Sequence, residues 1–340
     1  MPLTPIPGIT RLRAFQLGLE STFKTPVAAT RRMPWTATPT IQPNWTFPSA
    51  DTGTLDMAIA PFRKAFDVTF QSVGQLFAND VPTIQSAGVM GGITLSGTPK
   101  TFTTTPHSTS QDVFDTYTGE WFDDASVNGD SWQCTGGVIE RIQLHYVPDQ
   151  GPIDATCDWR FAEAVYGATP TGSLNVDTAP VPMFMADTEF YVNDTYGAIE
   201  TTKLTDICYE ATIDYVNNLD IKRFANGSNT RFQVQNYGRG ERVITFTLHG
   251  AKQTAWIAEV GKWIADNPVE RFWGLKTTST VIAGSGIPYS MDIRIPGYWM
   301  NWSALEVNTN TAIQLEGHQI YDTNLAYPFY WKSTSTRAAL

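Results

Sequence analysis

Residues 14–35 read AFQLGLESTFKTPVAATRRMPW. At the start of this stretch, apolar side chains alternate with Gln16 and Gly18, which is the two-residue period of a strand with one buried face. Prolines then recur from Pro26 to Pro48. Because proline interrupts a helix and removes a backbone donor from a sheet, this stretch can form neither a long helix nor a central strand. We therefore expect a short strand followed by an extended arm over about residues 22–54.

The composition is that of a folded protein with few charges. Of the 340 residues, 42% are hydrophobic and 12% are aromatic, whereas only 16% are charged. An average soluble protein has about 25% charged residues. A monomer normally keeps its surface charged to stay apart from its neighbours, so a charge-poor chain favours large contacts between subunits. The length predicts roughly two domains.

The charge and the cysteines narrow the class of protein. A net charge of −10 argues against a protein that grips nucleic acid, since phosphate binding needs clustered lysine and arginine; plain solubility also accounts for it. Cys134, Cys157 and Cys208 have no metal-type spacing, so we expect reduced, buried fillers. The sequence shows no secretory signal and no run of about 18 apolar residues. We therefore expect synthesis in a cytoplasm and no membrane anchor.

Alternating patterns predict that strands dominate. The clearest is residues 204–216, where apolar residues alternate with Asp206, Glu210 and Asp214, so one face is apolar and the other wet. Similar alternation predicts strands at residues 62–70, 138–146 and 242–248. Breaks rich in Gly, Asn and Asp favour hairpins that join 138–146 to 153–161 and 302–307 to 312–320.

Two segments have helical patterns. From Thr254, which can cap a helix, apolar residues recur at helical spacing until Asn267-Pro268 stops the helix, and this apolar stripe should pack against a sheet. An earlier helix is predicted from Ser72 and Gln75, which have capping-box spacing, to a stop at Pro82. Each helix follows a strand, and a hairpin comes near the end of each half. This order predicts two copies of one module, at 1–167 and 183–340, with a connector at 168–182.

No pattern indicates catalysis. The four histidines are far apart in sequence and lack ligand spacing, and no phosphate loop or nucleophile elbow is present. A glycoside hydrolase would need two carboxylates facing each other across a groove; Glu210 and Glu306 are available, but nothing pairs them. The eleven tryptophans suit core packing. We expect a protein that is not an enzyme and has no cofactor and no metal.

The segment Gly18-Leu19-Glu20-Ser21-Thr22, which leads from a strand into small residues and an arm, resembles the opening of tail tube (major tail) proteins of long-tailed (siphovirus) bacteriophages. The resemblance is most specific over the first fifty residues or so. It implies a mainly β fold of two tandem tail-tube-like β-sandwich or barrel modules, each flanked by one α-helix, with an extended N-terminal arm. It also implies rings of copies stacked into a tube. Three two-module chains would give a pseudo-sixfold ring; six chains would be needed if the second half is a decoration domain.

The same resemblance implies a structural virion protein in the tail, a conduit for DNA ejection into the host. Its partners would be copies of itself and a tape measure protein, and the viral double-stranded DNA would pass through without specific binding. Candidate lumen-facing residues are Asp206, Glu210 and Asp214, whose alternative is an outer solvated face. Candidate residues of an inter-ring arm are Phe23, Arg31, Arg32, Trp35 and Trp45. The alternative function is a carbohydrate- or receptor-binding β-sandwich module.

Overall fold

The computed structural model describes residues 13–47, 61–89, 91–106, 115–123, 131–172, 174, 177, 180–224, 233–238, 240–307, 310–322 and 328–340. Up to residue 166 the elements are β1 (Ala14–Leu19), β2 (Arg31–Met33), β3 (Thr36–Thr46), β4 (Phe62–Gln75), α1 (Val81–Gly88), β5 (Thr94–Ser96), β6 (Lys100–Thr104), β7 (Tyr117–Phe122), β8 (Ser131–Tyr146), β9 (Asp154–Phe161) and β10 (Glu163–Tyr166).

The later elements are β11 (Thr188–Asn193), β12 (Cys208–Val216), β13 (Asp220–Lys222), β14 (Asn236–Gly238), β15 (Val243–Ala251), α2 (Thr254–Trp263), β16 (Arg271–Val281), β17 (Pro288–Val307), β18 (Asn310–Gln319) and β19 (Tyr330–Ser335). Short 3-10 turns lie at Pro148–Gln150, Met185–Asp187 and Tyr196–Ala198. The predicted mainly β class is confirmed. No helix among the described residues is long and apolar enough to cross a membrane.

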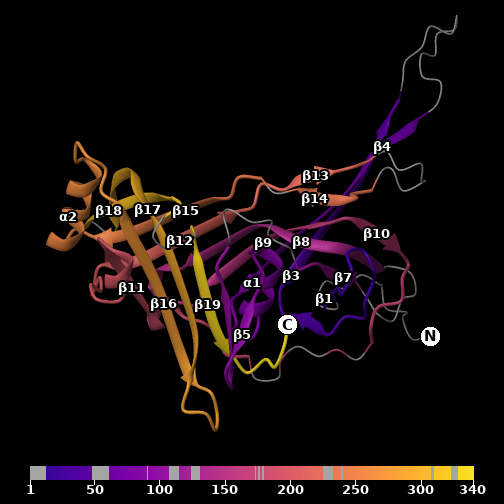
Figure 1. Ribbon diagram of the computed structural model, residues 1–340, viewed down its shortest axis with the longest axis horizontal. Helices are drawn as coiled ribbons and strands as arrows, with labels where there is room; N and C mark the ends of the chain where they lie inside the picture. The colour runs from indigo at the N-terminus through magenta and orange to yellow at the C-terminus, as the bar shows by residue number, and fades with distance from the viewer. Residues whose placement is uncertain are drawn as a thin grey trace, which may run out of the picture.

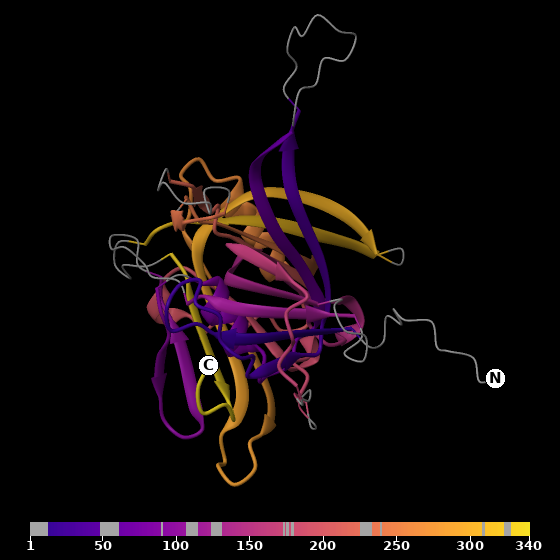
Figure 2. The ribbon, with the colours of Figure 1, turned by 90° about the vertical axis from the view of Figure 1, so that its right-hand side faces the viewer.

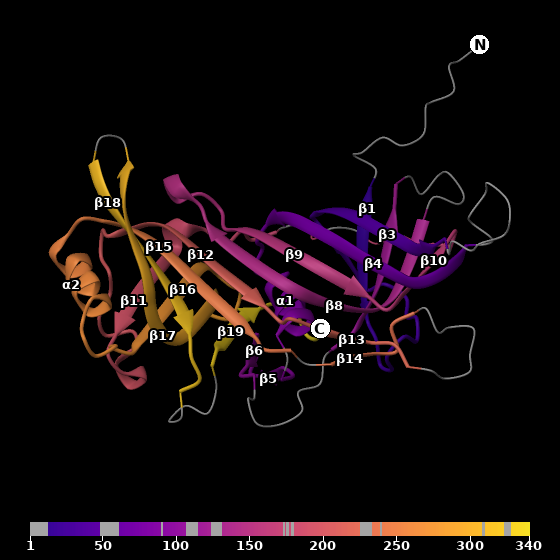
Figure 3. The same cartoon turned by 90° about the horizontal axis from the view of Figure 1, so that it is seen from above.

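One antiparallel sheet runs through the whole molecule. Its strands pair in the order β3-β4-β9-β8-β12-β15-β18-β17, and Figure 3 shows most of them side by side from above. The long strands β8 and β17 each continue into a second group of strands. The start of β8 pairs with β7 and β10, and β7 pairs with β1. The start of β17 pairs with β16 and β19, which lead to β11 and β6.

Aromatic rings fill the space between these groups of strands. Phe15 of β1 lies 5.7 Å from Phe70 of β4 and 5.8 Å from Trp159 of β9, measured between ring centroids. In the later half, Phe246 of β15 lies 5.6 Å from Trp273 of β16. All five rings are buried. The alternating pattern of the strands therefore buries one face of the long sheet and leaves the other face polar.

The predicted hairpins are confirmed: β8 pairs with β9, and β17 pairs with β18. The strand predicted from residue 204 begins only at Cys208, because residues 205–207 form a turn in which Asp206 has a positive φ of 56°. The described strands form no closed barrel, since the long sheet ends at β3 on one side and at the second half of β17 on the other.

The later helix is confirmed as α2, although Ile257 and Ile264 of its predicted apolar stripe are exposed. The earlier helix prediction was wrong. Residues 72–75 continue β4, where they pair with β9, and α1 begins at Val81 with Pro82 in its first turn. Proline fits there because the first N–H groups of a helix have no partner within the helix. Pro82 therefore starts the helix rather than stopping it.

The structure also differs from the predicted extended arm. Residues 36–46 form β3, which pairs with β4 in a long hairpin that projects from the body (Figures 1 and 2). Pro39 and Pro43 lie in this strand; they are tolerated because β3 is an edge strand. No central strand forms, as predicted, but residues 36–46 are a strand paired with β4 and not an unpaired arm. Residues 48–54 of the predicted arm lie outside the described residues.

Candidate interface

The two halves of the chain meet through a strand pair in the middle of the long sheet. β8 of the earlier half pairs with β12 of the later half, with Leu144 opposite Ile213. On the polar face, Arg141 of β8 donates two hydrogen bonds to Asp214 of β12, at 2.7 and 2.8 Å. We call this pairing of β8 with β12 the internal joint.

A carboxylate between two histidines adds to the internal joint. Glu210 accepts hydrogen bonds from His145 Nε2 of β8 at 3.0 Å and from His249 Nδ1 of β15 at 2.6 Å. Burial acts to raise the pKa of Glu210, but the two histidines outweigh it and hold the pKa below its usual value. The histidines looked isolated in the sequence. Only the register of three neighbouring strands brings them to one carboxylate.

We expect Glu210→Gln to weaken the acid sensitivity of the fold. A carboxylate with a lowered pKa stabilises the folded state above its ordinary pKa, and that stabilisation is lost as the pH falls through the folded-state value. The wild type should therefore lose about 1 kcal/mol more than the variant between pH 6 and pH 3, a modest figure because the pair is partly solvated. Thermal unfolding across this range measures it, with Asp206→Asn as a control outside the cluster. Equal pH slopes for wild type and Glu210→Gln would contradict it.

The segment after β12 extends the internal joint. The backbone N–H of Asn217 donates to the carbonyl of Glu140, and its side-chain amide donates to the carbonyls of Gly88, at the end of α1, and Ile139. Leu219 packs on buried Val138. The internal joint therefore consists of the paired strands, the charged pairs on the polar face, and Asn217 bound at the end of α1.

Both halves of the chain pair their strands in the same order. In the earlier half the order is β1-β7-β8-β9-β4-β3, and in the later half it is β11-β16-β17-β18-β15-β12. A helix follows β4 and β15 alike. The registers of β8 and β17 also slip in the same place, between Ile139 and Arg141 and between Trp299 and Asn301.

This correspondence can be followed residue by residue. Arg141 is the first paired residue of β8 after the slip. Its successive partners on β9 and β4 end at Thr38 of β3. In the later half, Asn301 leads across β18 and β15 to Thr212. Thus β3 corresponds to β12, and the second half of β17 corresponds to the part of β8 that forms the internal joint.

The counterparts of the joint strands are the two open edges. Within the described residues, β3 pairs only with β4, and residues 298–307 of β17 pair only with β18. Large side chains are exposed beside these edges, among them Met300 at 62% and Trp302 at 40% on β17 and Trp45 at 51% on β3. A surface that is buried in the middle of the molecule thus has a counterpart at each end with which no further described strand pairs.

The three candidate lumen residues do not all lie on the same strand. Glu210 and Asp214 lie on the polar face of β12, in the centre of the long sheet, whereas Asp206 lies in the turn before the strand. Carboxylates outnumber guanidinium groups on this face. Along β9, β8, β12, β15 and β18 the face carries Asp154, Asp158, Glu210, Asp214 and Glu316 beside Arg141 and Arg160.

The candidate arm residues are mostly committed to contacts within the chain. Arg31 pairs with buried Asp80, Trp35 is only 5% exposed, and the ring of Phe23 lies against Tyr237. Arg32 is partly exposed in β2. Of the five, Trp45 alone is a largely exposed aromatic on the projecting hairpin. Arg31, Trp35 and Phe23 therefore anchor the hairpin and the body instead of reaching outward.

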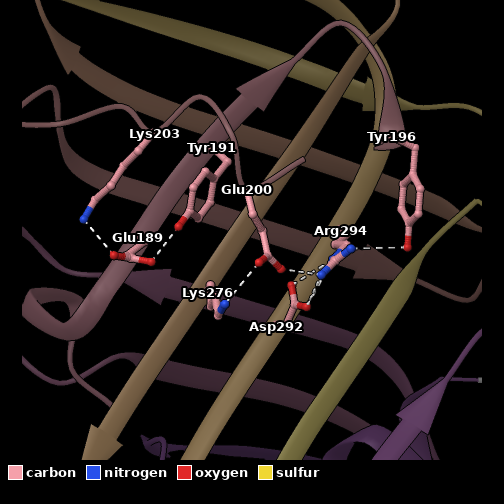
Figure 4. A network of polar contacts seen from close by, with 8 residues as sticks. All are labelled: Glu189, Tyr191, Tyr196, Glu200, Lys203, Lys276, Asp292 and Arg294. Atoms are coloured by element: carbon pink, nitrogen blue, oxygen red, sulfur yellow. Dashed lines mark hydrogen bonds and ion pairs between the residues drawn. The ribbon is translucent and has the colours of Figure 1, made fainter. Parts of the chain in front are cut away.

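A second polar cluster lies on β11, the segment that follows β11, β16 and β17 (Figure 4). Its residues are Glu189, Tyr191, Tyr196, Glu200, Lys203, Lys276, Asp292 and Arg294. Lys203 pairs with Glu189 at 2.8 Å and Lys276 with Glu200 at 3.1 Å, while Arg294 pairs with Asp292 and Glu200. Each cation thus has a carboxylate partner, as in a structural network. Within the described parts of the chain, no three His, Cys, Asp or Glu side chains could hold a metal ion.

Glu306, the second carboxylate considered for glycoside hydrolysis, lies in β17, and its side chain is outside the described residues. No known protein family model matches the chain, and no curated protein matches it.

Proposed function

We propose that this chain is a structural building block that associates edge to edge with copies of itself, and that the resulting rings stack into a phage tail tube. The observation that carries the proposal is the internal joint, whose two strands have uncovered counterparts at the opposite ends of the same sheet. If the second half of β17 accepts β3 of the next copy as β8 accepts β12, the sheet continues from copy to copy. Closure of that sheet into a ring leaves no exposed edge.

We infer that each half, with its helix, is one copy of a repeated module. Three chains then supply six modules to a ring, which is the pseudo-sixfold arrangement; a hexamer is the alternative. The polar face of the long sheet lines the lumen, with Glu210 and Asp214 on it. Its excess of carboxylates repels the phosphates of DNA and offers them no binding sites, which suits a conduit for double-stranded DNA in a virion tail. A tape measure protein would occupy the same lumen before ejection.

Electron microscopy at rising protein concentration tests this function. We expect monomers at low concentration, then rings whose projections show six similar lobes, and then stacked tubes. Sedimentation of the same samples should give a fast species that grows with concentration. Persistent monomers that bind glycans on an array would contradict the proposal and favour the carbohydrate- or receptor-binding alternative.

A further inference from the structure

The outer edge of β3 contains prolines where its counterpart has hydrogen-bond donors. The carbonyl of Ala37 points away from β4, since it accepts a hydrogen bond from the Trp121 indole at 3.1 Å. The carbonyl of Thr40 points toward β4, where Thr69 reaches it at 3.4 Å. Backbone groups alternate in direction along an antiparallel strand. Pro39, Ile41 and Pro43 therefore share the outward direction of Ala37.

The counterparts on β12 are Ile213, Tyr215 and Asn217, which follow from the match of Thr38 with Thr212. They face β8 in the internal joint, where the N–H of Asn217 donates to Glu140 at 2.8 Å. All three have an N–H to give. On β3, Pro39 and Pro43 have none, so between them only Ile41 can donate. The carbonyls of all three β3 residues are still able to accept.

We propose that Pro39 and Pro43 set the threshold for self-association, by weakening the pairing of β3 with β17 of the next copy relative to the internal joint. This inference rests on the proposed function and names its contact. By correspondence with β8, Ile41 lies opposite Trp302, and Pro39 lies opposite Ala304. A donor-poor edge keeps free chains apart after synthesis, since proline on an edge strand opposes indiscriminate pairing. Assembly then occurs only when many such contacts form together.

A pocket at the end of α2 also fits β3 of the next copy. Asn217, which follows β12, lies against the earlier half of the chain, between the end of α1 and β8. The corresponding position in the later half, between α2 and β17, is a pocket. It is lined in part by Trp263, Pro268, Tyr298 and Met300. The segment of β3 that follows Pro43 would enter it, because Pro43 is the counterpart of Asn217. The second copy thus covers the exposed apolar side chains beside β17.

A cysteine pair tests the register of this contact. Thr40 and Ser303 would be directly opposite and not hydrogen-bonded to each other, the closer type of pair, with Cβ atoms about 4.5 to 5.5 Å apart. The full-length double variant Thr40→Cys with Ser303→Cys should give covalent dimers and larger oligomers on mild oxidation under assembly conditions. The matched pair Gln42→Cys with Ser303→Cys, offset diagonally, should give several-fold less. A disulfide within one chain is not possible because the two positions lie at opposite edges of the sheet.

Substitution of the proline tests the threshold. Pro39→Ile, which copies the counterpart Ile213, restores one N–H, so assembly should begin at an about 2- to 10-fold lower concentration in sedimentation velocity. Pro39→Ala should act in the same direction, because it restores the donor without adding apolar surface, whereas Thr38→Ala should not. Tubes with an unchanged or higher threshold in both Pro39 variants would overturn the role of the prolines. Tubes of the double variant Thr40→Cys with Ser303→Cys that form no disulfide between copies would overturn the register alone, and the absence of any ring or tube would instead overturn the proposed function.

Discussion

Glu259→Leu is expected to destabilise the folded chain by about 3 to 5 kcal/mol, because it removes the buried partner of Arg271 and leaves this arginine only the largely exposed Asp194. Arg271 of β16 is 1% exposed and donates two hydrogen bonds to Glu259 of α2, both at 2.8 Å. The indole of Trp299 in β17 donates to the same carboxylate at 2.9 Å. One carboxylate thus ties α2 to two strands, and its loss would take a large part of the roughly 5 to 15 kcal/mol by which domains are usually stable. Urea unfolding followed by tryptophan fluorescence measures the change.

The double variant Glu259→Leu with Arg271→Met is the control. Removing both charges also removes the cost of burying an unpaired ion, so we expect it to recover more than half of the lost stability. The Trp299 N–H would still lack a partner, which should prevent full recovery. A loss below about 1 kcal/mol in the single variant, or a double variant less stable than Glu259→Leu, would show that the buried pair does not hold the helix.

Sequence periodicity predicted the strands that have one polar and one buried face. β9, β12 and β15 all alternate in this way, so their pattern is set locally by the face that each strand buries. For β1 the alternation predicted one buried face, but both faces are buried. Gln16 on its polar side is buried as well and donates to Glu120 at 3.1 Å. That burial depends on residues a hundred positions away, which no local pattern records.

The errors at α1 and β3 both concern proline. A proline fits the first turn of a helix and stops a helix that precedes it, so Pro82 was compatible with either boundary. Pro39 and Pro43 excluded a central strand but not an edge strand, and the partner strand β4 decided between arm and hairpin. Proline limits what a segment can be. It does not say which of the remaining structures tertiary contacts will select.

The candidate interface could be predicted only in outline. An order of strands and helices suggested a repeat, yet the internal joint depends on the register between β8 and β12, which are separated by about 60 residues of chain. The pairing of Glu210 with His145 and His249 follows from the same register. The residues that face each other across a sheet are fixed by alignment of whole strands, whereas the sequence shows only which face each residue takes.

Ala304→Pro is expected to raise the concentration needed for assembly by about 10- to 100-fold while leaving the monomer folded. The counterpart of Ala304 is Leu144, which lies opposite Ile213 in the internal joint, so the N–H of Ala304 points outward and would donate to the carbonyl of Pro39 in the next copy. Loss of that donor leaves a buried carbonyl unsatisfied, at about 1 to 3 kcal/mol per contact. Proline is tolerated here because this part of β17 is an edge whose ladder to β18 does not use that N–H.

Ala304→Val is the matched variant, since it adds side-chain bulk but keeps the N–H. Its assembly threshold in sedimentation velocity should stay within about 3-fold of the wild type, and urea unfolding of both variants should lie within about 1 kcal/mol of it. Because every contact around a ring loses the same hydrogen bond in Ala304→Pro, the defect should be larger for closed rings than for dimers. Normal tubes from Ala304→Pro would mean that this edge of β17 is not where copies join.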